Sequence, residues 1–178
     1  MINLQQLNFN SLKTQEELFI KMVLDAWHTQ VKRTGDLFDL FSDEQLMKEI
    51  APGRNRGIYL LGHLTAVHDK MLPVLGLGHQ LNPELYHIFV ENRDKAIANI
   101  PATANLRHLW KEVNNILSQR FNKLTPAEWF QKHNSVSEED FEKEPHRNRL
   151  NLVINRTNHL ASHQGQLLYL KEKSADAV

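Results

Sequence analysis

Residues 146–171 read HRNRLNLVINRTNHLASHQGQLLYLK, and the most helical pattern of the chain coincides here with its sharpest polar motif. Apolar side chains recur every three or four residues, which places them on one face of an α-helix. His159 and His163 lie four residues apart on that helix, so their imidazoles project from a common face. The stretch therefore predicts a long helix with an apolar core face and an inward polar stripe, and such a stripe needs a partner.

Three further stretches have helical periodicity: residues 14–38, 55–75 and 102–123. Alternating β-branched runs, the usual sign of strands, do not occur. Four long helices predict an all-α fold, a four-helix bundle. The long mixed segment 79–101 predicts a crossover with a short helix between the second and third long helices, in place of a simple meander.

Short helices and turns are also predicted between the long helices. Ser42, with Gln45 three residues later, predicts a capped helix over residues 43–50. Capped turns are also expected after Thr125 and Ser137, and a helix start at Pro83. In the first long helix Leu18 and Met22 follow helical spacing, with Phe19, Val23 and Trp27 beside them.

The composition limits the class of protein. A length of 178 residues fits one domain, so we expect residues 1–178 to fold as a unit. Lys plus Arg and Asp plus Glu each number 21, a balance that argues against nucleic acid or an acidic membrane as partner. Residues 1–6 lack a signal-peptide pattern and no stretch is apolar enough to span a bilayer, so we expect a soluble, cytoplasmic protein. The absence of cysteine excludes disulfides and a cysteine nucleophile.

The two histidines of the last helix suggest a metal site only when a third ligand joins them. By itself a His-x-x-x-His pair is weak, and Leu160 replaces the glutamate that a zincin motif would need. His63 lies on the core stripe of the second long helix, between Leu60 and Val67. A lone histidine in such a place is usually bonded to a carbonyl, but here it offers the missing donor. Three neutral imidazoles with one open position form the catalytic type of metal site.

Other polar residues are weaker candidates. His68 is a rival third ligand, but it lies about 140° around the helix from His63. We expect His68 and Asp69 on an exposed polar face. Gln166 and Asn155 extend the polar stripe, and Gly165 would allow a helix or ligand to approach closely. A half di-iron motif at Glu84 and His87 has no second copy. The remaining histidines fall in loops, at helix ends or at amphipathic boundaries: His28, His79, His108, His133 and His146.

Two motifs together resemble a known family. Residues 62–69 (GHLTAVHD) and 158–167 (NHLASHQGQL) are similar to the histidine motifs of the DinB-like (DinB/YfiT) superfamily. The resemblance implies a four-helix bundle with a three-histidine metal site near one end, often in a homodimer. It implies that His63, His159 and His163 hold one divalent ion, nickel or zinc in the first place, with iron, manganese or cobalt as alternatives. It also implies a small-molecule substrate, such as a low-molecular-weight thiol.

Three functions stay open at this stage. The first is a metal-dependent enzyme, a transferase or hydrolase that activates water or a thiol. The second is a non-catalytic protein that binds metal for a structural role or for an interaction, for example in a stress response. The third is a metal-free helical bundle. Three imidazoles suit zinc, nickel, copper, iron or cobalt alike. No general base is identified, because Gln166 and Asn155 take no proton at neutral pH. Metal affinity should fall below about pH 6, because a ligating histidine must be neutral.

Overall fold

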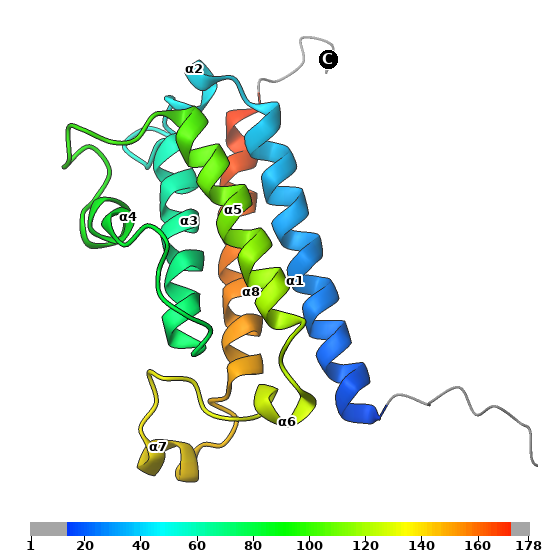
Figure 1. Ribbon diagram of the computed structural model, residues 1–178. Helices are drawn as coiled ribbons and strands as arrows, with labels where there is room; N and C mark the ends of the chain where they lie inside the picture. The colour runs from blue at the N-terminus through cyan, green and yellow to red at the C-terminus, as the bar shows by residue number, and fades with distance from the viewer. Residues whose placement is uncertain (1–13, 172–178) are drawn as a thin grey trace, which may run out of the picture.

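The computed structural model describes residues 14–171, and all regular secondary structure in that range is helical. The expected all-α class is confirmed. The long helices lie side by side in Figure 1 and contact one another: α1 (Gln15–Leu40), α3 (Gly57–Val74), α5 (Thr103–Phe121) and α8 (Arg149–Leu167). Each predicted long helix is found, with ends shifted by a few residues. The N-terminal stretch, residues 1–6, on which the absence of a signal peptide was judged, lies outside the described residues.

Short helices connect the long ones. They are α2 (Asp43–Leu46), α4 (Glu84–Tyr86), a π-helix (His87–Glu91), α6 (Pro126–Trp129) and α7 (Glu138–Lys143). A 3₁₀ turn (Leu168–Leu170) follows α8. No helix in residues 14–171 is long and apolar enough to cross a membrane.

Local sequence explains where most helices begin. Thr14, Ser42 and Thr125 each form a complete capping box with the residue three places on, and Ser137 accepts a bond from the backbone of Asp140. The helix expected over residues 43–50 is shorter than predicted and ends at Leu46. The reason is a turn after it, in which Ile50 N–H donates to the carbonyl of Asn55 and so leaves the helical pattern.

The apolar residues that reveal the helical spacing of α1 do not all lie on its buried face. Leu18, Phe19 and Met22 are 52%, 47% and 62% exposed. Val23 and Trp27, also named in the sequence, are buried, and α1 buries four further residues: Ile20, Thr34, Leu37 and Phe38. Because the early turns of α1 carry apolar residues on two sides, periodicity alone could not decide which side packs against α5 and α8.

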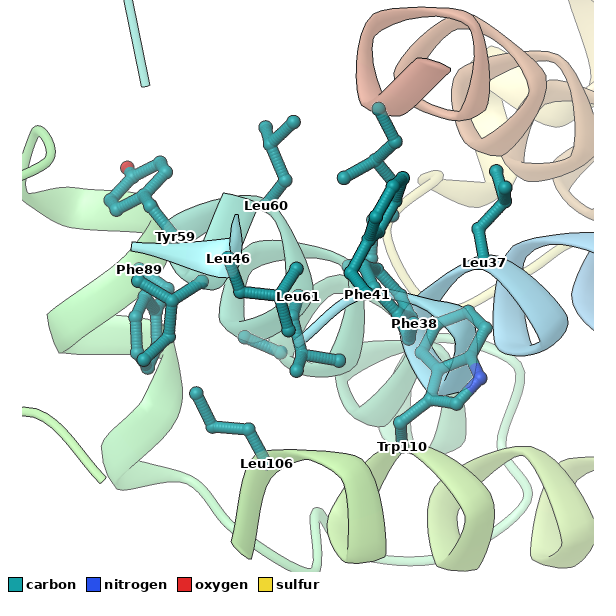
Figure 2. Close-up of a cluster of buried hydrophobic side chains, with 14 of the residues drawn as sticks. Leu37, Phe38, Phe41, Leu46, Tyr59, Leu60, Leu61, Phe89, Leu106 and Trp110 are labelled. Atoms are coloured by element: carbon teal, nitrogen blue, oxygen red, sulfur yellow. The ribbon is translucent and has the colours of Figure 1, made fainter. Parts of the chain in front are cut away.

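The core consists of two clusters of buried side chains. Figure 2 shows part of one, where Phe38 and Trp110 meet edge to face with ring centroids 5.5 Å apart. The same cluster includes Phe89, from the connection between α3 and α5. The second cluster centres on Trp27, Phe121 and Trp129.

His68 and Asp69 are buried, so the exposed polar face expected for them is wrong. The His68 ring lies between the rings of Trp27 and Trp110, at centroid distances of 4.6 and 5.0 Å. Its Nδ1–H donates to Asn114 Oδ1 over 2.8 Å. The carboxylate of Asp69 accepts the backbone N–H groups of residues 81 and 82, both at 2.8 Å. This side of α3 is covered by neighbouring elements. The carboxylate of Asp69 and the Nδ1–H of His68 have specific partners there, whereas Nε2 of His68 is buried with no hydrogen-bond partner among the described residues.

We expect the stability of the metal-free protein to fall in acid because of His68. Burial lowers the pKa of His68 to about 3, whereas in an unfolded chain its pKa is about 6.5. The unfolded state thus binds more protons between these values, and unfolding becomes easier by up to about 1.4 kcal/mol for each pH unit below 6.5. Urea unfolding of chelator-treated protein at pH 7 and pH 5 measures this drop. It should be smaller in a His68→Gln variant, and an equal drop in both proteins would contradict the assignment.

Candidate metal centre

Three imidazole nitrogens from two helices converge on one point. His63 comes from the middle of α3, and His159 and His163 come from α8. The Nε2 atom of His159 lies 3.3 Å from Nε2 of His63 and 3.1 Å from Nε2 of His163. Among residues 14–171 these three form the one group of histidine and acidic side chains whose ligand atoms can hold a metal ion, with all atoms within 4.8 Å of one another.

The spacing of these nitrogens fits a divalent ion. Two nitrogens bound tetrahedrally at ~2.0–2.1 Å from an ion lie about 3.3 Å apart, close to the two Nε2 separations. The rings are also not stacked on one another. Their planes cross at 63°, 71° and 90°, so the imidazoles radiate from the shared point as ligands do.

Two of the histidines have their tautomer set by an acceptor on the far side of the ring. His63 Nδ1–H donates to the backbone carbonyl of Phe89 over 2.9 Å. His163 Nδ1–H donates to Gln166 Oε1, also over 2.9 Å. Both Nε2 atoms therefore present lone pairs to the shared point, the arrangement found in most histidine metal ligands. Gln166 thus orients His163, and the carbonyl partner expected for a core histidine is present at His63 as well.

The connection between α3 and α5 holds the acceptor of His63 in place. A Cβ atom at Gly62 would lie 2.5 Å from the ring of Phe89, so only glycine allows this ring to pack on α3. Tyr59, one turn earlier, stacks beside His63 and donates its hydroxyl to the carbonyl of Asn92 over 2.6 Å. Phe89 belongs to the π-helix His87–Glu91, a conformation common at functional sites.

The hydrogens available at the shared point are too few for three nitrogens. Since His63 and His163 each carry their proton on Nδ1, only His159 can place a hydrogen between the Nε2 atoms. In that tautomer the Nδ1 of His159 is an acceptor, and it is buried without a hydrogen-bond partner among the described residues. A cation at the shared point would accept all three lone pairs at once. The three imidazoles therefore lack hydrogen-bond donors for their lone pairs, and a metal ion at the shared point would take the place of those donors.

The surroundings keep two of these histidines neutral, the form that binds metal. Burial lowers the pKa of His63, and the charges of His163 and Arg156 add to this effect. Burial, followed by the neighbouring His163 and His63, lowers the pKa of His159 to about 4. Protons therefore compete with a metal at these two positions only at lower pH than the value near 6 that the sequence suggested.

A pocket of about 210 Å³ opens on this cluster. It is lined by His63 and His159 and by apolar side chains of α3 and α8, among them Val67 and Met71. A second pocket, of about 580 Å³, is lined by His163 and Gln166 and by residues of the loop before α3. The cluster is thus open to small molecules from more than one pocket.

The other polar residues singled out in the sequence lie elsewhere. Asn155 is exposed and is not part of the pocket, and no described atom lies within 4 Å of a Cβ built on Gly165, so the close approach expected there is wrong. His28 is hydrogen-bonded to Ser118, and His87 pairs with Glu91 outside any metal cluster.

Arg156, which the sequence analysis missed, lines the pocket beside His159. Its position three residues before His159 was a usable signal, because that spacing places it on the same helix face. The carbonyl of Phe89 was not foreseeable, because every residue carries a backbone acceptor.

Comparison with protein-family models finds no family that matches the chain, and comparison with curated proteins finds no match either. Membership of the DinB-like superfamily stays a prediction.

We expect a Gly62→Ala substitution to weaken metal binding although residue 62 offers no ligand. The added methyl group would displace Phe89 and with it the acceptor of His63. Loss of such an outer partner typically weakens metal affinity about 10–100-fold. Competition with a chelating dye measures the affinity, and circular dichroism monitors folding.

Gly165→Ala is the matched control for that experiment. It adds the same methyl group to α8 in open space, two residues from His163. Affinity should stay unchanged, and helix stability should rise by up to about 1 kcal/mol. Equal losses of affinity in both variants would contradict the role given to Phe89.

Proposed function

We propose that this protein binds one divalent metal ion through His63, His159 and His163 and is a metal-dependent enzyme. The observation that carries the proposal is the convergence of three Nε2 atoms on a point that offers them at most one hydrogen. Nickel and zinc are the first candidates for the ion because of the motif resemblance, with iron, manganese and cobalt as alternatives. Imidazole ligands suit nickel, zinc and iron in particular.

An open coordination position supports catalysis over a purely structural role. Among the described residues no fourth histidine or carboxylate joins the cluster, whereas structural zinc sites are closed by four protein ligands. An ion with one free position beside a pocket would lower the pKa of a bound water or thiol and so produce a nucleophile at neutral pH. No carboxylate lines the pocket, so activation by the ion itself is the simplest mechanism.

The reaction class that fits is transfer or hydrolysis with a small-molecule substrate. A low-molecular-weight thiol as the nucleophile is a proposal from the motif resemblance. The presence of a second pocket on His163 favours a two-substrate transfer, because a thiol and its acceptor need separate places. The histidines and the walls of the pockets would hold and orient these molecules and exclude water.

The architecture we propose is the DinB-like four-helix bundle with a long crossover. It is supported by the motifs at residues 62–69 and 158–167. The colours of Figure 1 support it too, because α3 and α5 run in the same direction and the connection between them must return along the molecule. A homodimer belongs to the same proposal, as does the absence of nucleic acid or membrane partners.

The alternative is a non-catalytic protein in which the ion is structural or serves an interaction, for example in a stress response. The favouring observation is that the cluster joins α3 to α8, so an ion would cross-link two long helices. Metal binding would then contribute folding free energy directly.

Elemental analysis of untagged protein should find about one transition-metal ion per chain. A His159→Ala variant should lose more affinity than the roughly 10–100-fold that outer partners cost, because it removes a ligand itself. His79→Ala, at an exposed position outside the cluster, should bind as the native protein does. Equal losses in the two variants, or no metal in either, would reject the site.

Assays of the loaded protein separate the enzyme from the structural alternative. Zinc- or nickel-loaded protein should accelerate the consumption of a thiol by an electrophile, or the hydrolysis of an activated ester, and His159→Ala should abolish the effect. A structural ion should instead raise the unfolding temperature by many degrees with no turnover in any assay. Turnover that is equal with and without metal would overturn the proposed mechanism.

A further inference from the structure

The pocket of about 210 Å³ beside the histidine cluster is lined by an arginine that makes no ion pair with any residue in the described range 14–171. Arg156 is partly buried on α8, one turn before His159, and it lines this pocket together with His63 and His159. We propose that the pocket binds a small organic anion, with its acidic group on Arg156 and its body against the apolar wall. The role of that anion as substrate of the metal centre rests on the proposed function.

Arg156 differs from the other partly buried arginines of residues 14–171, each of which has a hydrogen-bond or ion-pair partner. Arg56 is paired with Asp94 over 2.7 Å, and Arg107 with Asp43 over 2.9 Å, with further bonds to backbone carbonyls. For Arg156, no carboxylate within ion-pair distance and no hydrogen-bond acceptor is found among residues 14–171. A partly buried cation without such a partner costs free energy, which a bound anion would offset.

Lys70 makes the pocket more cationic. Its ammonium group lies 5.4 Å from the ring centroid of Tyr86 and 3.4 Å from Gln80 Oε1, and both Lys70 and Tyr86 line the pocket. No aspartate or glutamate is among the lining residues. Two cations without a carboxylate between them favour an anionic ligand over a neutral or cationic one.

The rest of the wall defines the body of the ligand. Val67, Met71 and Val74 of α3 face Leu152 of α8 across the pocket, and Val90 adds to this surface. Such a wall favours an aliphatic or aromatic body over inorganic phosphate or a sugar. The volume, about 210 Å³, is below the roughly 300–1,000 Å³ of pockets for drug-sized ligands, so the anion is small.

Benzoate and benzamide form the first test, because they share a shape and differ in charge. Titration calorimetry of zinc-loaded native protein should show benzoate binding at least about tenfold more tightly than benzamide, as expected for a charge-assisted bond to a guanidinium. Higher salt should reduce this difference. Equal affinities, or no binding of benzoate, would overturn the proposal, and no variant is needed for this comparison.

Arg156→Gln tests the assigned residue. Benzoate affinity should fall at least about tenfold while the zinc content, measured by elemental analysis, stays at its native value. Arg120→Gln is the matched control, because it removes the same charge from an exposed position of α5 outside the pocket. Unchanged benzoate binding in folded Arg156→Gln would reject the role of Arg156.

Two further measurements separate the alternatives. Inorganic phosphate that binds as tightly as benzoate would show that the apolar wall contributes nothing, and would overturn the organic part of the proposal. Native protein that binds no metal yet prefers benzoate to benzamide would refute the proposed function and leave the anion pocket standing. Native protein that holds zinc but binds benzoate and benzamide equally would refute the anion pocket and leave the proposed metal site standing.

Discussion

The site depends on one electrostatic constraint, the meeting of three imidazole Nε2 atoms at a point with too few hydrogens. His63 and His163 hold their protons on the opposite nitrogen, because the carbonyl oxygen of Phe89 and Oε1 of Gln166 accept hydrogen bonds there. Lone pairs that face one another in a desolvated place repel, and a cation removes that repulsion. The same desolvation lowers the pKa of His159 and keeps it ready to bind metal at neutral pH.

The helix α3 can hold His63 at the shared point because neighbouring elements cover this helix on several sides. Its His63 side is covered by the connection that carries Phe89, and its His68 side by Trp27 and Trp110. Two histidines five residues apart thus have different chemistry on one helix. His63 lines a pocket and faces two other histidines, whereas His68 is enclosed by aromatic rings and bonded to an amide. Burial and partners decide these roles, since the residue type is the same.

Charged and apolar side chains surround the histidine cluster, as they would in a site for a small molecule. Arg156 lowers the pKa of His63 and His159, it lines the pocket, and it makes no ion pair within residues 14–171. Apolar side chains on the facing helices exclude water from the same space. Metal, anion and apolar body would then share one pocket, the combination expected where a bound nucleophile meets an organic substrate.

The sequence by itself determined the helices, most of their caps and the histidine pair of α8, because periodicity, capping boxes and the spacing of that pair are local properties. It indicated His63 through the place of this residue on the core stripe of its helix, but only folding brings His63 to the pair, 96 residues away from His159. Tertiary structure decided the face of α1 that is buried, the burial of His68 and Asp69, and the place of Arg156 in the pocket. These outcomes depend on which helix covers which face. A helical pattern specifies that a face is apolar but not what lies opposite it, and a backbone acceptor such as that of Phe89 leaves no mark in the sequence.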